Sequence, residues 1–192
     1  MATDLLQRPT GQGTVGLATF GTGSYHWDRV NEEAADDTDG VESSGTSVVK
    51  DRLTFPALGI TGTINSVRLY GRFYSLGLPA KTQAPYARVG FYIGSTEYYS
   101  ATWVPATSFT EYYKEWTVSP ATSAAFTVAE IDAASYLISL LSGDYDDGKG
   151  GTIWENSECS QFWRVVNYTE TAGGFIQQIM KHKYIPPFIG GR

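Results

Sequence analysis

The feature that most constrains the fold is an alternation of residue type between positions 64 and 74. One side of an extended chain would carry Val67, Leu69 and Phe73. The other side would carry Arg68, Tyr70, Arg72 and Tyr74. A period of two residues is typical of a strand that packs one face on a core. We therefore expect a β-strand here, in an antiparallel sheet that has one face turned to solvent.

Shorter runs of the same kind occupy much of the remaining chain. We expect strands over residues 25–30, 47–55, 86–93, 96–104, 111–118 and 161–168. Glycine, proline or serine separates these runs. Aromatic residues make up 14% of the chain and charged residues only 18%, a balance that favours strands. The pattern predicts an all-β protein, a jelly-roll-like antiparallel β-sandwich.

The segment that begins at Thr127 carries the signature of a helix N-terminus. The Thr127 hydroxyl can accept a hydrogen bond from the backbone N–H of Glu130, whose side chain can reach back to the cap. Residues at helical spacing then follow: Val128, Ile131, Ala134, Ser135, Ile138 and Leu141. Gly143 is placed to end the helix. We expect one short α-helix that covers an open end or face of the sandwich.

The two ends of the chain differ in composition from the middle. Residues 1–24 are rich in threonine and glycine, and we expect an extended N-terminal arm, the alternative being a disordered tail. Residues 25–171 form the expected sandwich domain. Residues 172–192 hold three basic residues and no acid, and we expect an extended C-terminal arm. A fully extended arm of this length would reach up to about 70 Å.

The charge balance and the apolar runs exclude several functions. The formal net charge is −6 without an evident basic patch, which disfavours nucleic-acid binding. The single cysteine, Cys159, excludes an internal disulfide framework. The N-terminus lacks the apolar core of a signal peptide, and no run approaches the ~18 apolar residues of a membrane span. We expect a protein that is made in the cytoplasm and does not bind a membrane.

Two acidic segments are candidate cation sites. Residues 32–42 hold six acids and no base. Oxygen ligands for a structural calcium ion would come from Glu33, Asp36, Asp37 and Asp39. The alternative is a solvated acidic loop. In residues 144–151 an EF-hand frame fails, because Gly148 stands where a ligand belongs and Lys149 where glycine belongs. We expect a polar loop there, and no other cofactor.

The sequence shows no clear set of catalytic residues. His26 could serve a Ser-His-Asp arrangement, but no GxSxG motif marks a serine, and His182 lies in the C-terminal arm. Cys159 precedes a hydrophobic strand, as a small core residue does. No motif marks the carboxylate pair of a glycosidase. We expect no catalytic residues and no enzyme activity.

Aromatic residues crowd the central strands. They include Tyr70, Tyr74, Tyr92, Tyr98, Tyr99, Trp103, Tyr112, Tyr113 and Trp116. A row of exposed rings can stack on sugars, which would indicate a carbohydrate-binding module that uses Trp103 or Trp116. The alternative is that the rings lie in the core or at a subunit interface, where Tyr and Trp are enriched.

Several segments occur in an order that is typical of one group of proteins. YHWDRVNEE is followed by the acidic DDTDGVES, then by VVKDRLTFPAL and INSVRLYGRFY. Later come EYYKEWTVSPATSAAFTVAEIDAASYLISL and ECSQFWRVVNY. This order, over about residues 25–168, resembles tailed-bacteriophage structural proteins with a β-sandwich or jelly-roll domain. The chain departs from that pattern at Phe126, where such proteins often have tryptophan, and in the inserted DYDDGKGG.

The resemblance implies a virion protein, and we expect a capsid decoration (cement) protein that bridges neighbouring major-capsid subunits. Both arms would reach those subunits or other virion proteins. Contacts of the C-terminal arm would come from Phe175, Ile176, Ile179, Lys181, Lys183, Tyr184, Ile185, Phe188, Ile189 and Arg192. Jelly-roll analogy points to a homo-oligomer, a trimer. The alternatives are a tail, connector or fibre protein, or a receptor-binding carbohydrate module.

Overall fold

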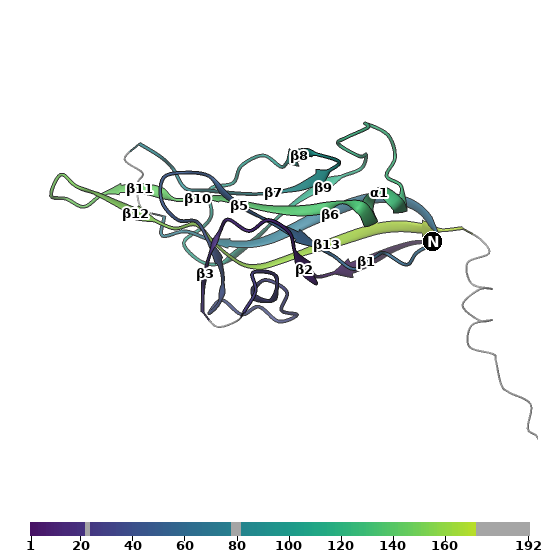
Figure 1. The fold of residues 1–192 in the computed structure, drawn as a ribbon, viewed down its shortest axis with the longest axis horizontal. Helices are drawn as coiled ribbons and strands as arrows, with labels where there is room; N and C mark the ends of the chain where they lie inside the picture. Colours follow the sequence, from purple (N-terminus) through teal and green to yellow (C-terminus); the bar gives the residue numbers. More distant parts are fainter. Residues whose placement is uncertain (22–23, 78–81, 172–192) are drawn as a thin grey trace, which may run out of the picture.

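The computed structural model describes residues 1–21, 24–77 and 82–171. Within these ranges the chain forms thirteen strands, one α-helix and one 3-10 turn. The strands make two antiparallel sheets and a separate hairpin (Figure 1). The prediction of an all-β sandwich with a single short helix is confirmed.

The larger sheet has six strands. Their bounds are Ala2–Gln7 (β1), Ala18–Phe20 (β3), Gly40–Glu42 (β4), Gly62–Tyr74 (β6), Thr110–Trp116 (β9) and Glu158–Glu170 (β13). Their order is β3-β4-β13-β6-β9, and β1 also pairs with β13. The long strands β6 and β13 pair along almost their whole length, so they form the centre of this sheet.

The smaller sheet has five strands. Their bounds are Gly11–Gln12 (β2), Val49–Thr54 (β5), Tyr86–Ile93 (β7), Thr96–Tyr99 (β8) and Ser135–Leu141 (β10). Their order is β2-β5-β10-β7-β8. Counted in chain order from β4, without the hairpin, eight main strands are divided equally between the sheets. In the larger sheet these strands lie side by side in the order first-eighth-third-sixth. In the smaller sheet their order is second-seventh-fourth-fifth.

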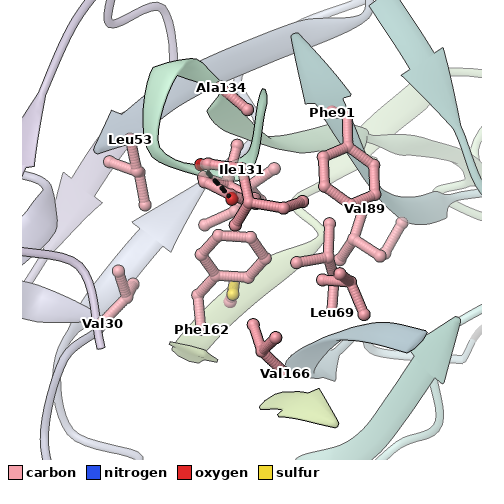
Figure 2. Packing of buried hydrophobic residues seen from close by; sticks show 14 of the residues in the cluster. Val30, Leu53, Leu69, Val89, Phe91, Ile131, Ala134, Phe162 and Val166 are labelled. Carbon is pink, nitrogen blue, oxygen red and sulfur yellow. Dashed lines mark hydrogen bonds between the residues drawn. The ribbon is translucent and has the colours of Figure 1, made fainter. Parts of the chain in front are cut away.

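The core lies between the two sheets, where their inward residues meet. The apolar side of β6 (Val67, Leu69 and Phe73) is fully buried, as the alternation predicts. Ile131 of the helix is buried in the same cluster. Figure 2 shows Leu69 and Ile131 among residues of other elements, including Leu53, Val89, Phe91, Phe162 and Val166.

A charged residue of β13 lies inside this core. Arg164 of β13 is 1% exposed, and its guanidinium lies over the rings of Phe55 and Tyr136, 5.0 and 4.9 Å from their centroids. Its N–H groups donate to the Oε1 of Gln7, the carbonyl of Pro56 and the Tyr136 hydroxyl. A buried charge is tolerated only with such partners. Gln7, in the first strand, therefore belongs to the polar network of the core.

The N-terminal segment is not a free arm, and that prediction is wrong. β1 pairs with β13 from Ala2↔Thr169 to Gln7↔Arg164, while β2 pairs with β5 and β3 with β4. Short strands occur here because they satisfy N–H and C=O groups that the longer strands leave open. Glycine permits one close approach, since a Cβ on Gly16 would lie 2.9 Å from the carbonyl oxygen of Lys50. The first twenty residues thus belong to both sheets.

The helix is shorter than predicted. It spans Val128–Ala133 (α1), and the Thr127 hydroxyl accepts from the backbone N–H of Glu130 as expected. The following residues do not continue it, because they form the central strand β10. Residues 136–141 are all buried, so this run packs on both faces and its apolar residues show no strand period. Gly143 begins the next strand instead of ending the helix.

Two further local predictions are corrected. Residues 25–30 contain a 3-10 turn, Trp27–Arg29 (η1), in place of a first strand. The expected polar loop at 144–151 is part of a hairpin of Gly143–Asp146 (β11) and Thr152–Glu155 (β12), and residues 147–151 form its turn. This hairpin extends beyond both sheets at one end of the molecule (Figure 1).

Candidate functional site

The acidic segment between η1 and β4 turns its carboxylates toward different partners. Asp36 accepts from the backbone N–H and the hydroxyl of Thr38. Asp37 forms an ion pair with Arg72, 2.7 Å from Nη2 to Oδ2, and this bond keeps the Asp37 pKa below its usual value. In the described part of the chain, no group of three or more acidic, histidine or cysteine side chains is arranged to hold a metal ion. The described residues therefore provide no support for the hypothesis that Glu33, Asp36, Asp37 and Asp39 bind calcium.

The second acidic segment forms turns and anchors the hairpin. Asp146 and Asp147 accept from the backbone N–H groups of Gly148 and Lys149. Asp144 is buried at the base of the hairpin. Burial opposes its ionisation, but hydrogen bonds from the Thr82 hydroxyl and nearby backbone N–H groups outweigh burial and lower the Asp144 pKa to about 2. These carboxylates serve the local structure.

His26 and Asp51 form a pair that resembles two members of a catalytic triad. His26 Nδ1 lies 2.6 Å from Asp51 Oδ2, and Asp51 is fully buried. The other Asp51 oxygen accepts from the N–H groups of Gly16 and Leu17. Among the described residues no serine, threonine or cysteine side chain hydrogen-bonds to the imidazole. The pair therefore fastens the N-terminal loop to β5, and the arrangement lacks a nucleophile.

Cys159 is fully buried. Burial raises the pKa of its thiol, which is the opposite of what a nucleophilic thiolate needs. The interpretation as a small core residue agrees with this position.

The outer face of the larger sheet carries a stack of aromatic rings. Trp163, Tyr70 and Tyr113 lie opposite one another on β13, β6 and β9. The ring centroids are 5.0 Å apart between Trp163 and Tyr70, and 5.1 Å between Tyr70 and Tyr113. Arg8 lies over Trp163. Because the rings face one another, they tie the strands together and do not form a flat surface for a sugar.

The two tryptophans proposed for sugar binding pack on the core. Trp103 lies against Phe73 and Tyr112, and Trp116 makes an edge contact with Phe91 at 4.9 Å. Both are partly buried against the hydrophobic cluster. The alternative in which Trp103 and Trp116 are exposed sugar-binding residues gains no support, because inward rings from β9 and the β8–β9 connection fill the edge of the sandwich.

The outer face of the smaller sheet contains a groove of about 200 Å³. Its lining comprises Thr14, Lys50, Arg52, Tyr92, Glu97 and Leu137. Tyr92 is one of the aromatic residues that crowd the central strands, whereas no sequence motif marks Lys50 or Arg52. The alternation in β5 was the available signal, because it places these two cations on the side opposite the buried Asp51 and Leu53.

The projecting hairpin exposes apolar residues. Ile153 and Trp154 of β12 are 45% and 38% exposed. The end of the larger sheet at the base of the hairpin is acidic, because Glu158 of β13 lies opposite Glu42 of β4. Burial, and then the charges of Glu42 and Glu155, raise the Glu158 pKa to about 7. This end of the molecule thus combines exposed apolar side chains with a cluster of acidic residues.

The ten expected partner-binding residues of the C-terminal arm, from Phe175 to Arg192, lie outside the described residues. Their role stays a prediction.

Fold and surfaces together place the chain in the class of antiparallel β-sandwich proteins. No protein-family model matches the chain, and no curated protein matches it. Over the part that the structure covers, no helix is both long and apolar enough to cross a membrane.

Proposed function

We propose that this protein is a non-enzymatic structural component of a tailed-bacteriophage particle, where it decorates the capsid and bridges neighbouring major-capsid subunits. The observation that carries the proposal is the hairpin β11–β12, which extends beyond the sandwich and exposes Ile153 and Trp154 (Figure 1). A two-stranded hairpin has little stability of its own. Apolar side chains on such an element are typical of a surface that becomes buried against another protein.

The fold supports the same proposal. The segments that resemble tailed-phage structural proteins lie within the sandwich. The strand order, first-eighth-third-sixth and second-seventh-fourth-fifth, supports its classification as a jelly roll. The absence of a nucleophile bonded to His26 within the described ranges, together with the burial of Cys159, favours a structural role over an enzymatic one.

Charge supports a protein partner at the hairpin end. Glu42 and Glu155 lie close enough to Glu158 for their negative charges to oppose its ionisation. A basic segment of a partner protein would relieve this repulsion on binding. Residues 172–192, with three basic residues and no acid, have the composition to bind acidic surfaces of neighbouring subunits.

Co-sedimentation with DNA-filled capsids that lack the protein tests the proposal. The full-length chain should saturate at a fixed ratio to capsid subunits. The double variant Ile153→Ser, Trp154→Ser should bind at least about tenfold more weakly, because exposed aromatic anchors carry much of an interface. The variant Val118→Ser is the matched control, since Val118 is also 45% exposed but lies away from the hairpin. Deletion of residues 172–192 tests the C-terminal arm separately.

The outcomes distinguish the alternatives. Saturable binding to heads that the hairpin variant loses would support decoration. Binding to tails but not to heads would move the protein to a tail, connector or fibre position. Absence of binding to any particle, or equal loss in Val118→Ser, would overturn the proposal.

A further inference from the structure

The groove on the smaller sheet closes at its base on one apolar side chain. Leu137 of β10 is 1% exposed and lies opposite Gly90 of β7. A Cβ on Gly90 would lie 2.4 Å from the carbonyl oxygen of Tyr98 and 2.9 Å from the Tyr99 ring, so this ring covers the backbone at Gly90. The open space of the groove, its hollow, lies among the other lining residues, which are Thr14, Lys50, Arg52, Tyr92 and Glu97.

Arg52 stands at the edge of this hollow in a fixed position. Its guanidinium carbon lies 4.5 Å from the centroid of the Tyr92 ring. It also packs on Gly13, because a Cβ there would lie 2.8 Å from Arg52 Nε and 3.3 Å from Nη2. Contacts of this kind restrict the rotamers of arginine and prepare its donors for a ligand.

The guanidinium of Arg52 has no carboxylate partner within residues 1–21, 24–77 and 82–171. The nearest acid in the groove is Glu97, and both of its oxygens are already bound. One accepts from Lys50 Nζ at 2.5 Å, and the other accepts from the Tyr99 hydroxyl at 3.0 Å. The donors of Arg52 are thus available to an anion from outside.

The charge of this face is opposite to that of the whole protein. The strands of the smaller sheet turn Lys50, Arg52 and Arg88 outward against one acid, Glu97. Arg88 lies 3.7 Å from the centroid of the Tyr99 ring. An excess of two positive charges on one face of a chain with net charge −6 favours an anionic ligand.

We propose that this groove binds an acidic saccharide, a sugar whose carboxylate pairs with Arg52 and whose ring lies in the groove among Thr14, Lys50 and Tyr92. A volume of about 200 Å³ suits a single sugar ring. A pyranose carries hydroxyl groups around its ring, which match the polar side chains of Thr14 and Lys50 in the lining. The planar guanidinium takes a carboxylate through two parallel hydrogen bonds. This inference does not depend on the proposed role in a virion.

Titration calorimetry with matched sugars tests the inference. The probes are a galacturonic acid trisaccharide and its fully methyl-esterified form, and sialyllactose beside lactose. At least one carboxylated sugar should bind, its neutral counterpart should bind about tenfold more weakly or not at all, and rising salt should weaken the acidic sugar.

Three variants locate the site. Arg52→Met keeps the apolar stem and should abolish the preference for the acidic sugar. Gly13→Ala keeps the charge of Arg52 but displaces its guanidinium, and should weaken binding several-fold. This variant tests the site independently if Arg52→Met fails to fold. Arg68→Met is the control, because Arg68 lies on the larger sheet in ion pairs with Asp4 and Glu115, and it should bind normally.

Several results would overturn the inference. These are equal binding of acidic and neutral sugars, binding that Gly13→Ala leaves unchanged, and equal loss in Arg68→Met. Failure of both carboxylated probes to bind would overturn it too. Binding of a glutamate-rich peptide without binding of either sugar would reassign the groove to an acidic protein segment.

Discussion

Replacement of Gln7 with leucine removes an acceptor from the buried charge of Arg164. The Oε1 atom of Gln7 accepts from Arg164 Nε at 2.8 Å and from Nη2 at 2.5 Å. A hydrogen bond to a charged group contributes about 1.5–3 kcal/mol. Two such bonds disappear in Gln7→Leu, while Gln7 is only half-buried, so that water can replace part of the loss.

We expect the free energy of unfolding to fall by about 3 kcal/mol in Gln7→Leu. For a chain of this length the melting temperature should fall by roughly 6–12 °C. Urea denaturation and calorimetry measure the two quantities. The control is Thr3→Leu, an exposed position on the same strand, which should stay within about 0.5 kcal/mol of the unmodified chain.

A double variant separates the charge from the packing of β1. In Gln7→Leu, Arg164→Met the charge disappears together with its acceptor, so much of the stability lost in Gln7→Leu should return. The reasoning fails if Gln7→Leu costs less than about 0.5 kcal/mol, or if the double variant is no more stable than Gln7→Leu.

Three further predictions concern pH, reactivity and the helix cap. The raised Glu158 pKa of about 7, against an ordinary value of 4.5, means that the folded state binds this proton more tightly. The stability it provides is therefore present below about pH 4.5 and is lost as the pH rises to about 7. In urea titrations between about pH 4.5 and 7, the unfolding free energy of Glu158→Gln should fall by about 1–2 kcal/mol less than that of the unmodified chain. The effect is this small because Glu158 is only half-buried. An unchanged pH dependence of stability would contradict the assignment. Cys159 should resist a thiol reagent in the native protein and react once per chain after unfolding, and rapid native labelling would contradict its burial. Thr127→Ala should lower the unfolding free energy by about 1 kcal/mol, whereas Thr127→Ser should not, because serine retains the cap.

The strands that were predicted well are those with one buried face. In β6 the alternation of Val67, Leu69 and Phe73 with polar residues reports burial directly, because neighbouring side chains point to opposite sides of the sheet. The hairpin was missed for a related reason. In β12, Thr152, Ile153 and Trp154 are all exposed, so the strand has no buried side and no alternation to detect.

The secondary-structure predictions were wrong where a helical period of about 3.6 residues could not be distinguished from a buried strand. β10 is buried on both faces, and the continuous run from Tyr136 to Leu141 fits a helix stripe as well as a central strand. The true cap at Thr127 strengthened the wrong choice, because a real helix does begin there and ends after two turns at Ala133. The competition was decided by pairing, since β10 fills the place between β5 and β7.

The candidate site was only partly visible in the sequence. Tyr92 was counted among surface aromatic residues, but nothing local connects it with Arg52 and Gly13. These residues lie in three separate segments, and the groove exists because β5, β7 and the N-terminal loop meet on one face. A pattern that repeats every two residues shows which side a residue faces, and not which residue will lie beside it.

The sequence by itself determined the all-β class, the inward faces of the long strands and the start of the helix, because these follow from local periodicity and capping. Only the tertiary structure decided that the first residues belong to the sheets, that Arg164 is buried with Gln7, and that Arg52 stands over a hollow. Each of these depends on a contact between residues far apart in the chain. Whether such a contact forms is set by the hydrogen-bonding groups and the space that the rest of the fold leaves open.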